Sequence, residues 1–258
     1  MLFSSIIYGP VHSRRLGISL GINLMPTNAK VCTFNCIYCE CGWNTDNKAR
    51  HLTLPTVQEV YSQLETKLQE LQQSNVTPDV ITFSGNGEPT LHPDFESVIS
   101  HTITLRDTYF PSAKISVLSN STQLYRPDVQ RALTLIDNRI LKLDSAVTQT
   151  MRLIDIPNNQ HLTVPQIIEY LQPFNGKFTL QTCFLRGTLN DGTIINNTTN
   201  KEIEAWLDIL PQINPKDIMI YVIDRETPLK SLQKISPRKM EEIADKARQL
   251  GFKVSVSA

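Results

Sequence analysis

The sequence lacks an excess of charge of either sign and any long apolar run. Its 258 residues carry 25 basic and 25 acidic side chains. The chain therefore has no surplus of positive charge that would bind nucleic acid by neutralising phosphates over a broad surface. A local basic patch is still compatible with a net charge of zero. No uninterrupted apolar stretch approaches the roughly 18 to 20 residues that a membrane-spanning helix needs. We therefore expect no membrane association.

The N-terminal stretch also lacks the features of a secretory signal peptide. The apolar run that starts at Met1 is short and is broken by Gly9 and Pro10. It has neither a preceding basic segment nor a small-residue cleavage site. We expect a cytoplasmic protein, in which thiols stay reduced and grouped cysteines bind a metal or take part in catalysis.

No Pro/Gly/Ser-rich linker or short-period repeat divides the chain, so we expect a single domain over residues 1–258. Two helices are predicted by their ends. Residues 56–74 begin with the capping-box pattern of Thr56 and Glu59 and continue with an amphipathic stripe. Residues 236–250 begin with a Ser-Pro pair and stop before a glycine. Weaker helical patterns occupy residues 94–105, 126–136, 163–172 and 200–210.

Short runs rich in β-branched residues alternate with these helices. They lie at residues 18–24, 80–84, 115–118, 140–143, 178–184 and 218–223, and a seventh run at 252–256 follows the last helix. Alternation at this spacing predicts right-handed crossovers and a parallel sheet with helices packed outside it. The expected fold is therefore α/β, with six βα units and a short C-terminal helix-strand extension.

The cysteines are concentrated in one place. Four of the five lie within ten residues, and Cys32, Cys36 and Cys39 have the spacing C-x3-C-x2-C in a loop after the first predicted strand. Three thiolates on such a loop can hold three irons of a cubane cluster and leave the fourth iron open to a ligand. A structural zinc site normally needs two paired knuckles, which the crowded Cys41 does not provide. The remaining Cys41 and Cys183 are too few for a second cluster.

With Tyr38 directly before the third cysteine, this motif resembles the signature of the radical S-adenosylmethionine (SAM) enzymes. The resemblance implies that Cys32, Cys36 and Cys39 hold a [4Fe–4S] cluster whose open iron is chelated by SAM, with Tyr38 beside the cofactor. It implies that the reduced cluster cleaves SAM to a 5′-deoxyadenosyl radical, which abstracts hydrogen from a substrate. It also implies a partial (β/α)6 TIM-like barrel, in agreement with the six alternations counted above.

A second motif follows the second predicted strand. Residues 84–89 read Ser-Gly-Asn-Gly-Glu-Pro and resemble the Gly-Gly-Glu-Pro segment that holds the SAM amino group in that superfamily. Glycines let the backbone approach a ligand closely, and a carboxylate complements an ammonium. We therefore expect Gly85, Gly87 and Glu88 to contact SAM, with Asn86 altering the glycine pair. The alternative is a glycine turn with a solvated glutamate.

The ends of later strands supply further candidates. Ser119 and Asn120 follow the third predicted strand, where members of the superfamily often place polar contacts to SAM. Asp144, two residues after Lys142, ends the fourth and could meet the ribose or substrate. The structural alternatives are capping residues for the first pair and a rim ion pair for the second. Arg186, after the fifth strand, could bind a carboxylate or phosphate or form a surface ion pair.

The substrate is the open question. Residues 13–23 resemble a group of Fe–S oxidoreductases related to tRNA wyosine synthases, and His12, Arg14 and Arg15 could bind an anion. The tRNA enzymes carry extra cysteines and basic segments that this sequence does not contain. We expect a radical SAM enzyme acting on a small molecule or on a residue presented by a partner protein, with a reductant such as flavodoxin or ferredoxin. The alternatives are a glycyl-radical activase, a tRNA-modifying enzyme, or a scaffold that binds an Fe–S cluster or zinc.

Overall fold

The computed structural model describes residues 2–13, 16–46 and 52–258, so the predicted anion-binding residues Arg14 and Arg15 lie outside it. The chain forms two compact units that interleave along the sequence. Unit 1 comprises Met1–Cys32, Asn44–Ser119 and Gln123–Arg139, and unit 2 comprises Thr33–Trp43, Asn120–Thr122 and Ile140–Ala258. No helix in the described residues is long and apolar enough to cross a membrane.

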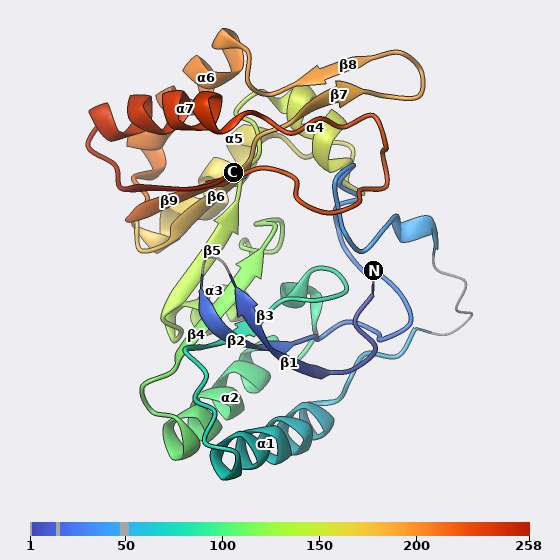
Figure 1. The fold of residues 1–258 in the computed structure, drawn as a ribbon, viewed down its shortest axis with the longest axis vertical. Helices are drawn as coiled ribbons and strands as arrows, with labels where there is room; N and C mark the ends of the chain where they lie inside the picture. Colours follow the sequence, from blue (N-terminus) through green and yellow to red (C-terminus); the bar gives the residue numbers. More distant parts are fainter. Residues whose placement is uncertain (1, 14–15, 47–51) are drawn as a thin grey trace. The chain divides into compact units, whose positions relative to one another are not determined.

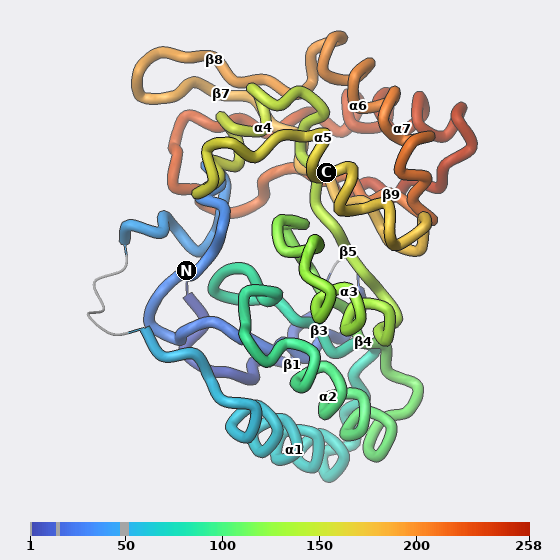
Figure 2. The backbone as a smooth tube through the Cα atoms, turned by 180° about the vertical axis from the view of Figure 1, so that it is seen from behind, coloured from blue at the N-terminus to red at the C-terminus, as the bar shows by residue number. Residues whose placement is uncertain are grey.

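Unit 1 contains strands in the order β1-β2-β3-β4. Their bounds are Ile7–Ser13, Gly17–Ile22, Val80–Phe83 and Lys114–Ser119. β1 runs antiparallel to β2, and the other neighbours are parallel. The helices of this unit are α1 (Val57–Gln73), α2 (Phe95–Tyr109) and α3 (Pro127–Thr134), with short 3-10 helices η1 (Asn44–Asp46) and η2 (Pro89–Leu91). α1 packs against α2 and α2 against α3, as both backbone views show (Figures 1 and 2).

Unit 2 contains β5 from Ile140 onward and continues in the strand order β5-β6-β9-β10, all parallel. Their bounds are Asn138–Lys142, Thr179–Cys183, Asp217–Tyr221 and Val254–Ser257. A small antiparallel pair, β7 (Arg186–Thr188) and β8 (Ile194–Asn196), follows β6. The helices are α4 (Thr148–Asp155), α5 (Val164–Leu171), α6 (Asn200–Ile213) and α7 (Pro237–Gln249), with the 3-10 helix η3 (Gln172–Phe174).

The helix ends follow the sequence signals closely. The Thr56 side chain accepts from the backbone N–H of Glu59, whose carboxylate accepts from the Thr56 N–H at 2.7 Å, so the predicted capping box of α1 is confirmed. The Ser236 side chain caps α7 by accepting from the backbone N–H of Lys239. The four weaker helical patterns correspond to α2, α3, α5 and α6. β1, α4 and the β7-β8 pair were not predicted.

The core of unit 2 lies directly under the cysteine loop. Ile37, from that loop, is fully buried together with Ile154, Cys183, Leu185, Ile195 and Leu229. Burying apolar side chains stabilises a fold by about 25 cal/mol for each Å² removed from water. Ile37 lies between Cys36 and Cys39 in the sequence. Its packing therefore fixes this part of the cysteine loop to the core of unit 2.

Candidate functional site

The loop that carries Cys36 and Cys39 is anchored through its backbone. The Ile37 N–H donates to the Ile154 carbonyl at 3.0 Å, and the Leu229 N–H donates to the Ile37 carbonyl at 3.2 Å. None of the five cysteines forms a disulfide. Within the described residues, no group of three or more His, Cys, Asp or Glu side chains is arranged to hold a metal ion. The ligand set of Cys32, Cys36 and Cys39 therefore stays a prediction.

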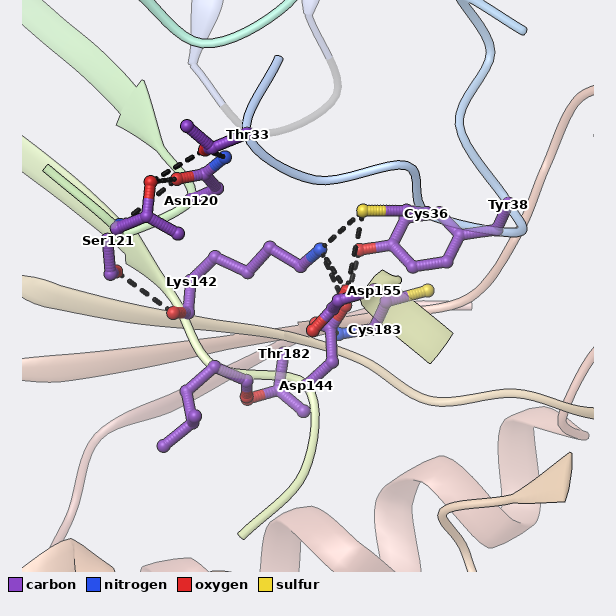
Figure 3. Close-up of polar contacts among 12 residues, drawn as sticks. Thr33, Cys36, Tyr38, Asn120, Ser121, Lys142, Asp144, Asp155, Thr182 and Cys183 are labelled. Atoms are coloured by element: carbon purple, nitrogen blue, oxygen red, sulfur yellow. Dashed lines mark hydrogen bonds and ion pairs between the residues drawn. The ribbon is translucent and has the colours of Figure 1, made fainter. Parts of the chain in front are cut away.

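The thiol of Cys36 belongs to a buried network of charges (Figure 3). Its sulfur accepts from the Lys142 ammonium at 3.0 Å and donates to Asp155 Oδ1 at 3.4 Å. The same ammonium pairs with Asp144 Oδ2 at 3.1 Å and with Asp155. Lys142 is 8% exposed, and both aspartates are 1% exposed. The predicted Lys142–Asp144 ion pair is thus present, but it is buried and is not on an exposed rim.

The burial of these groups sets their protonation. Burial opposes the charged form of Lys142, but Asp144 and Asp155 outweigh it and raise the pKa of Lys142 well above its usual value. Burial raises the pKa of Asp155 to about 7, against the opposing effect of Lys142. Burial and Asp144 together raise the pKa of Tyr38 well above its usual value. The site at neutral pH therefore holds one ammonium next to a neutral phenol.

Asp144 is the centre of this network. Its carboxylate accepts from the Tyr38 hydroxyl and from the Cys183 backbone N–H, the latter at 2.8 Å. The Tyr221 hydroxyl lies 3.4 Å from that of Tyr38. Burial raises the pKa of both Cys183 and Tyr221, so these groups also stay neutral. Tyr38 and Asp144, which were both predicted from the sequence to bind the cofactor, are thus in direct contact.

Gln181 carries a buried amide on the same face of the sheet as Lys142. It pairs with Lys142 across β5 and β6, so the two side chains lie on the same face of the sheet. Gln181 is 7% exposed, and in the described part of the chain its Nε2 atom has no hydrogen-bond partner. A buried donor without a partner costs about 1 to 3 kcal/mol. Such a group is a candidate contact for a ligand.

Asn120 lies beside the start of the cysteine loop. Its Nδ2 atom donates to Thr33 Oγ1 at 2.8 Å, and Thr33 directly follows Cys32 in the chain. Thr33 Oγ1 also lies 2.6 Å from Thr122 Oγ1, which donates to Asn120 Oδ1 at 2.8 Å. Ser119 ends β4 in unit 1 and is buried. Asn120 therefore positions the start of the cysteine loop directly.

The glycine-glutamate motif is built into unit 1. Gly87 has a φ of 143°, and a Cβ atom there would lie 1.8 Å from the Val31 carbonyl oxygen. The Glu88 N–H donates to that carbonyl at 3.0 Å, which joins the motif to the residue before Cys32. Glu88 is 2% exposed, so the reading of a solvated glutamate is wrong. Its carboxylate accepts from the Thr90 N–H at 3.1 Å.

The residue that alters the glycine pair has a structural role of its own. Asn86 is fully buried, and its Nδ2 atom donates to the carbonyls of Phe3 and Pro26, each at 2.8 Å. Its backbone N–H donates to Asn23 Oδ1 at 3.0 Å. Asn86 therefore fastens the turn to the N-terminal segment, and the flanking Gly85 and Gly87 approach Asn23 and Val31 closely.

Three residues of this site were not predicted from the sequence. They are Asp155 at the end of α4, Gln181 in β6 and Tyr221 at the end of β9. Gln181 had a usable signal, because it is a large polar residue in the middle of a buried strand. Asp155 had none, since its partner Cys36 lies 119 positions away in the chain.

Comparisons with known proteins give relatives of similar sequence. No family model matches the chain. A UPF0026 protein of Helicobacter pylori is 31% identical over 232 residues, which cover 88% of this chain and 68% of that protein. A UPF0026 protein of Methanocaldococcus jannaschii is 28% identical, covering 93% and 69%. A Brachyspira hyodysenteriae protein named GTPase Obg is 30% identical over 92% of this chain, but the chain spans only 32% of its length.

Solved structures share the fold at low sequence identity. A radical SAM methyltransferase from Sphaerobacter thermophilus has a TM-score of 0.65 at 12% identity, covering 92% of this chain and 65% of its own. TYW1 with a lysine-pyruvate adduct bound has a TM-score of 0.61 at 15%, covering 90% and 73%. Streptococcus suis SuiB bound to its precursor peptide has a TM-score of 0.61 at 14%, covering 89% and 47%. The predicted α/β fold, a partial barrel of the radical SAM type, is confirmed.

Proposed function

The chain belongs to the UPF0026 protein family and has the radical SAM fold, and on that basis we propose that it is a radical SAM enzyme. Cys32, Cys36 and Cys39 would hold one [4Fe–4S] cluster. When bound and reduced, that cluster would supply the electron that cleaves SAM to a 5′-deoxyadenosyl radical. The substrate from which hydrogen is taken is a small molecule or a residue of a partner protein.

The observation that carries this proposal is the buried network around Cys36. An ammonium and two carboxylates taken out of water are costly to bury, and replacing them with apolar residues is often neutral or stabilising. Lys142, Asp144 and Asp155 are nonetheless buried together beside a predicted cluster ligand. Stability alone does not explain this arrangement, whereas a ligand site does.

The donors and acceptors present suit the chemistry of SAM. The methionyl part of SAM carries an ammonium and a carboxylate, and its ribose carries hydroxyl groups. Gln181, the register partner of Lys142 on the neighbouring strand, offers an N–H donor that has no partner among the described residues and complements a carboxylate or hydroxyl oxygen. Buried Glu88 and Asp144 complement an ammonium or hydroxyl groups. Gly85, Gly87, Ser119 and Asn120 stay predicted contacts.

The chain's own residues have definable tasks in this mechanism. Lys142 stays protonated and places a positive charge against the Cys36 sulfur, which favours the thiolate that binds iron. Asp144 accepts from Tyr38 and so holds the ring at the cysteine loop. The buried side chains of this face keep water away from a reactive radical.

The test is anaerobic reconstitution with iron and sulfide, followed by dithionite reduction and chromatography for 5′-deoxyadenosine. Wild type should bind four irons and release 5′-deoxyadenosine from SAM. Cys36→Ala should abolish both, whereas the matched variant Cys41→Ala should keep the cluster. A chain that binds four irons and neither binds nor cleaves SAM would be a scaffold, and the proposal would be wrong.

The substrate and partner classes rest on weaker support. SuiB is bound to a precursor peptide in its solved structure, which supports a peptide or protein substrate as one candidate. A glycyl-radical activase and a tRNA-modifying enzyme stay the alternatives within the superfamily. The flavodoxin- or ferredoxin-type reductant and the cytoplasmic location also stay predictions. Incubation of the reduced enzyme with candidate substrates, read as substrate-dependent release of 5′-deoxyadenosine, separates the classes.

A further inference from the structure

A pocket of about 470 Å³ lies within unit 2 where three of its parallel strands end. Arg186 follows the end of β6, Val222 directly follows β9, and Ala258 directly follows β10, and all three line the pocket. Parallel α/β proteins bind their ligands at this carboxyl-terminal edge of the sheet. The pocket therefore lies where a substrate is expected, and the function proposed above does not use it.

The lining of this pocket is cationic. It includes Arg186, Lys234 and Lys239. Asp224 pairs with Lys234 at 2.9 Å, and Glu242 lies 3.7 Å from Lys239. The two lysines are therefore paired with carboxylates. Among the described residues Arg186 forms no ion pair with an acidic side chain, which leaves its guanidinium to contact a ligand.

A hydroxyl group and a helix N-terminus supplement this charge. Ser236 lines the pocket, as does Thr198, whose own hydroxyl donates to Asn196 Oδ1 at 2.6 Å. Ser236 is the N-cap of the 13-residue helix α7, whose N-terminus carries a partial positive charge. Lys239 lies in the first turn of that helix. Cationic residues, a hydroxyl group and a helix N-terminus around one pocket form a combination that binds phosphate groups.

We propose that this pocket binds a phosphate group of a small-molecule substrate. SAM carries no phosphate, so the ligand would be the second reactant, and this identification rests on the proposed function. A guanidinium presents a planar fork that matches two phosphate oxygens, which assigns the central contact to Arg186. A polymer of phosphates needs an extended basic surface, whereas this chain has no net charge and concentrates three cations in one pocket.

The experiment titrates inorganic phosphate into the full reconstituted chain by calorimetry, at constant ionic strength, with acetate as the carboxylate comparison. Arg186→Ala and Lys239→Ala should each weaken binding roughly tenfold or more, because each removes a charge-assisted hydrogen bond. The matched control is Arg238→Ala, which removes an exposed cation from the same helical turn outside the pocket. Arg186→Lys keeps the charge without the fork and should weaken binding by less. Circular dichroism confirms that each variant is folded.

The outcomes separate this proposal from the proposed function. Saturable phosphate binding that Arg186→Ala weakens and Arg238→Ala does not would support the pocket, and Cys36→Ala should leave it unchanged. Loss of SAM cleavage with phosphate binding retained would contradict only the enzyme proposal. No saturable binding, equal weakening by Arg238→Ala, or acetate binding as tight as phosphate would overturn the pocket proposal. Arg186-dependent binding of tRNA without binding of free phosphate would overturn it as well.

Discussion

The ammonium of Lys142 lies 3.0 Å from the sulfur of Cys36 and is held there by two buried aspartates. A cation at this distance favours the thiolate over the thiol, and thiolates are the form that binds iron. Charges and hydrogen bonds at cluster sulfurs also set the reduction potential of such clusters. Lys142 thus connects the fold of unit 2 to the electron transfer that the proposed reaction needs.

Replacing Lys142 with methionine should destabilise the chain strongly. The substitution keeps the length of the side chain but leaves Asp144 and Asp155 buried without their cation. Breaking a buried pair by removing one partner costs about 3 to 5 kcal/mol. Urea denaturation of the metal-free protein measures the change. The control is Lys230→Met, which removes an exposed lysine paired with Glu226 and should cost under about 1 kcal/mol.

Asp155 should make the stability of the metal-free chain depend on pH. Its folded pKa of about 7 lies above the ordinary value of 3.8, so the folded state binds the proton more tightly than the unfolded state. The resulting stabilisation is fully present below about pH 4 and is lost as the pH rises towards 7. Between the two pKa values, the unfolding free energy should fall by about 1.4 kcal/mol per pH unit. Comparing wild type with Asp155→Asn across this range isolates the contribution. A difference in unfolding free energy that is flat with pH would contradict the assignment.

Local signals predicted most of the fold, and the failures have physical causes. The capping box of Thr56 marked α1, because a cap and its partner lie only three residues apart. α4 was missed because its N-cap is Val147, which provides no capping side chain. β1 contains Gly9 and Pro10, which broke the strand pattern in the sequence.

The site was harder to predict than the fold because its contacts are distant in sequence. The cysteine spacing lies in one loop and could be read directly. The contact between Cys36 and Lys142 is made by residues 106 positions apart. Neither sequence periodicity nor composition predicts such a contact. The burial of Glu88 likewise depends on how the turn at Gly87 packs against Val31, which only the folded unit 1 shows.

A methyl group at Gly87 should disrupt the turn beside the cysteine loop. Its Cβ atom would lie 1.8 Å from the Val31 carbonyl oxygen, and the φ of 143° is strained for any other residue. Gly87→Ala should therefore cost more than about 3 kcal/mol of unfolding free energy. The matched control is Gly192→Ala, which also has a positive φ but no atom within 4 Å of the added carbon. It should cost about 1 kcal/mol. Equal costs in thermal denaturation would show that the turn yields to the added atom.

Gln181 should oppose stability and support binding, so its replacement should change the two in opposite directions. Gln181→Met keeps the volume and removes the buried N–H that has no partner in the described residues. The metal-free chain should then gain up to about 1 to 3 kcal/mol of unfolding free energy.

Binding should change in the other direction. If the amide contacts SAM or the substrate, affinity for that ligand should fall about five- to tenfold, the equivalent of one hydrogen bond. Thr182→Val, on the same strand, removes a hydroxyl that donates to the Leu143 carbonyl and accepts from Trp206. It should lower stability and leave affinity unchanged. Equilibrium dialysis with SAM, with and without reconstituted cluster, measures the affinity. A Gln181→Met chain that is less stable than wild type and binds SAM equally well would show that the amide stabilises the fold and does not contact the ligand.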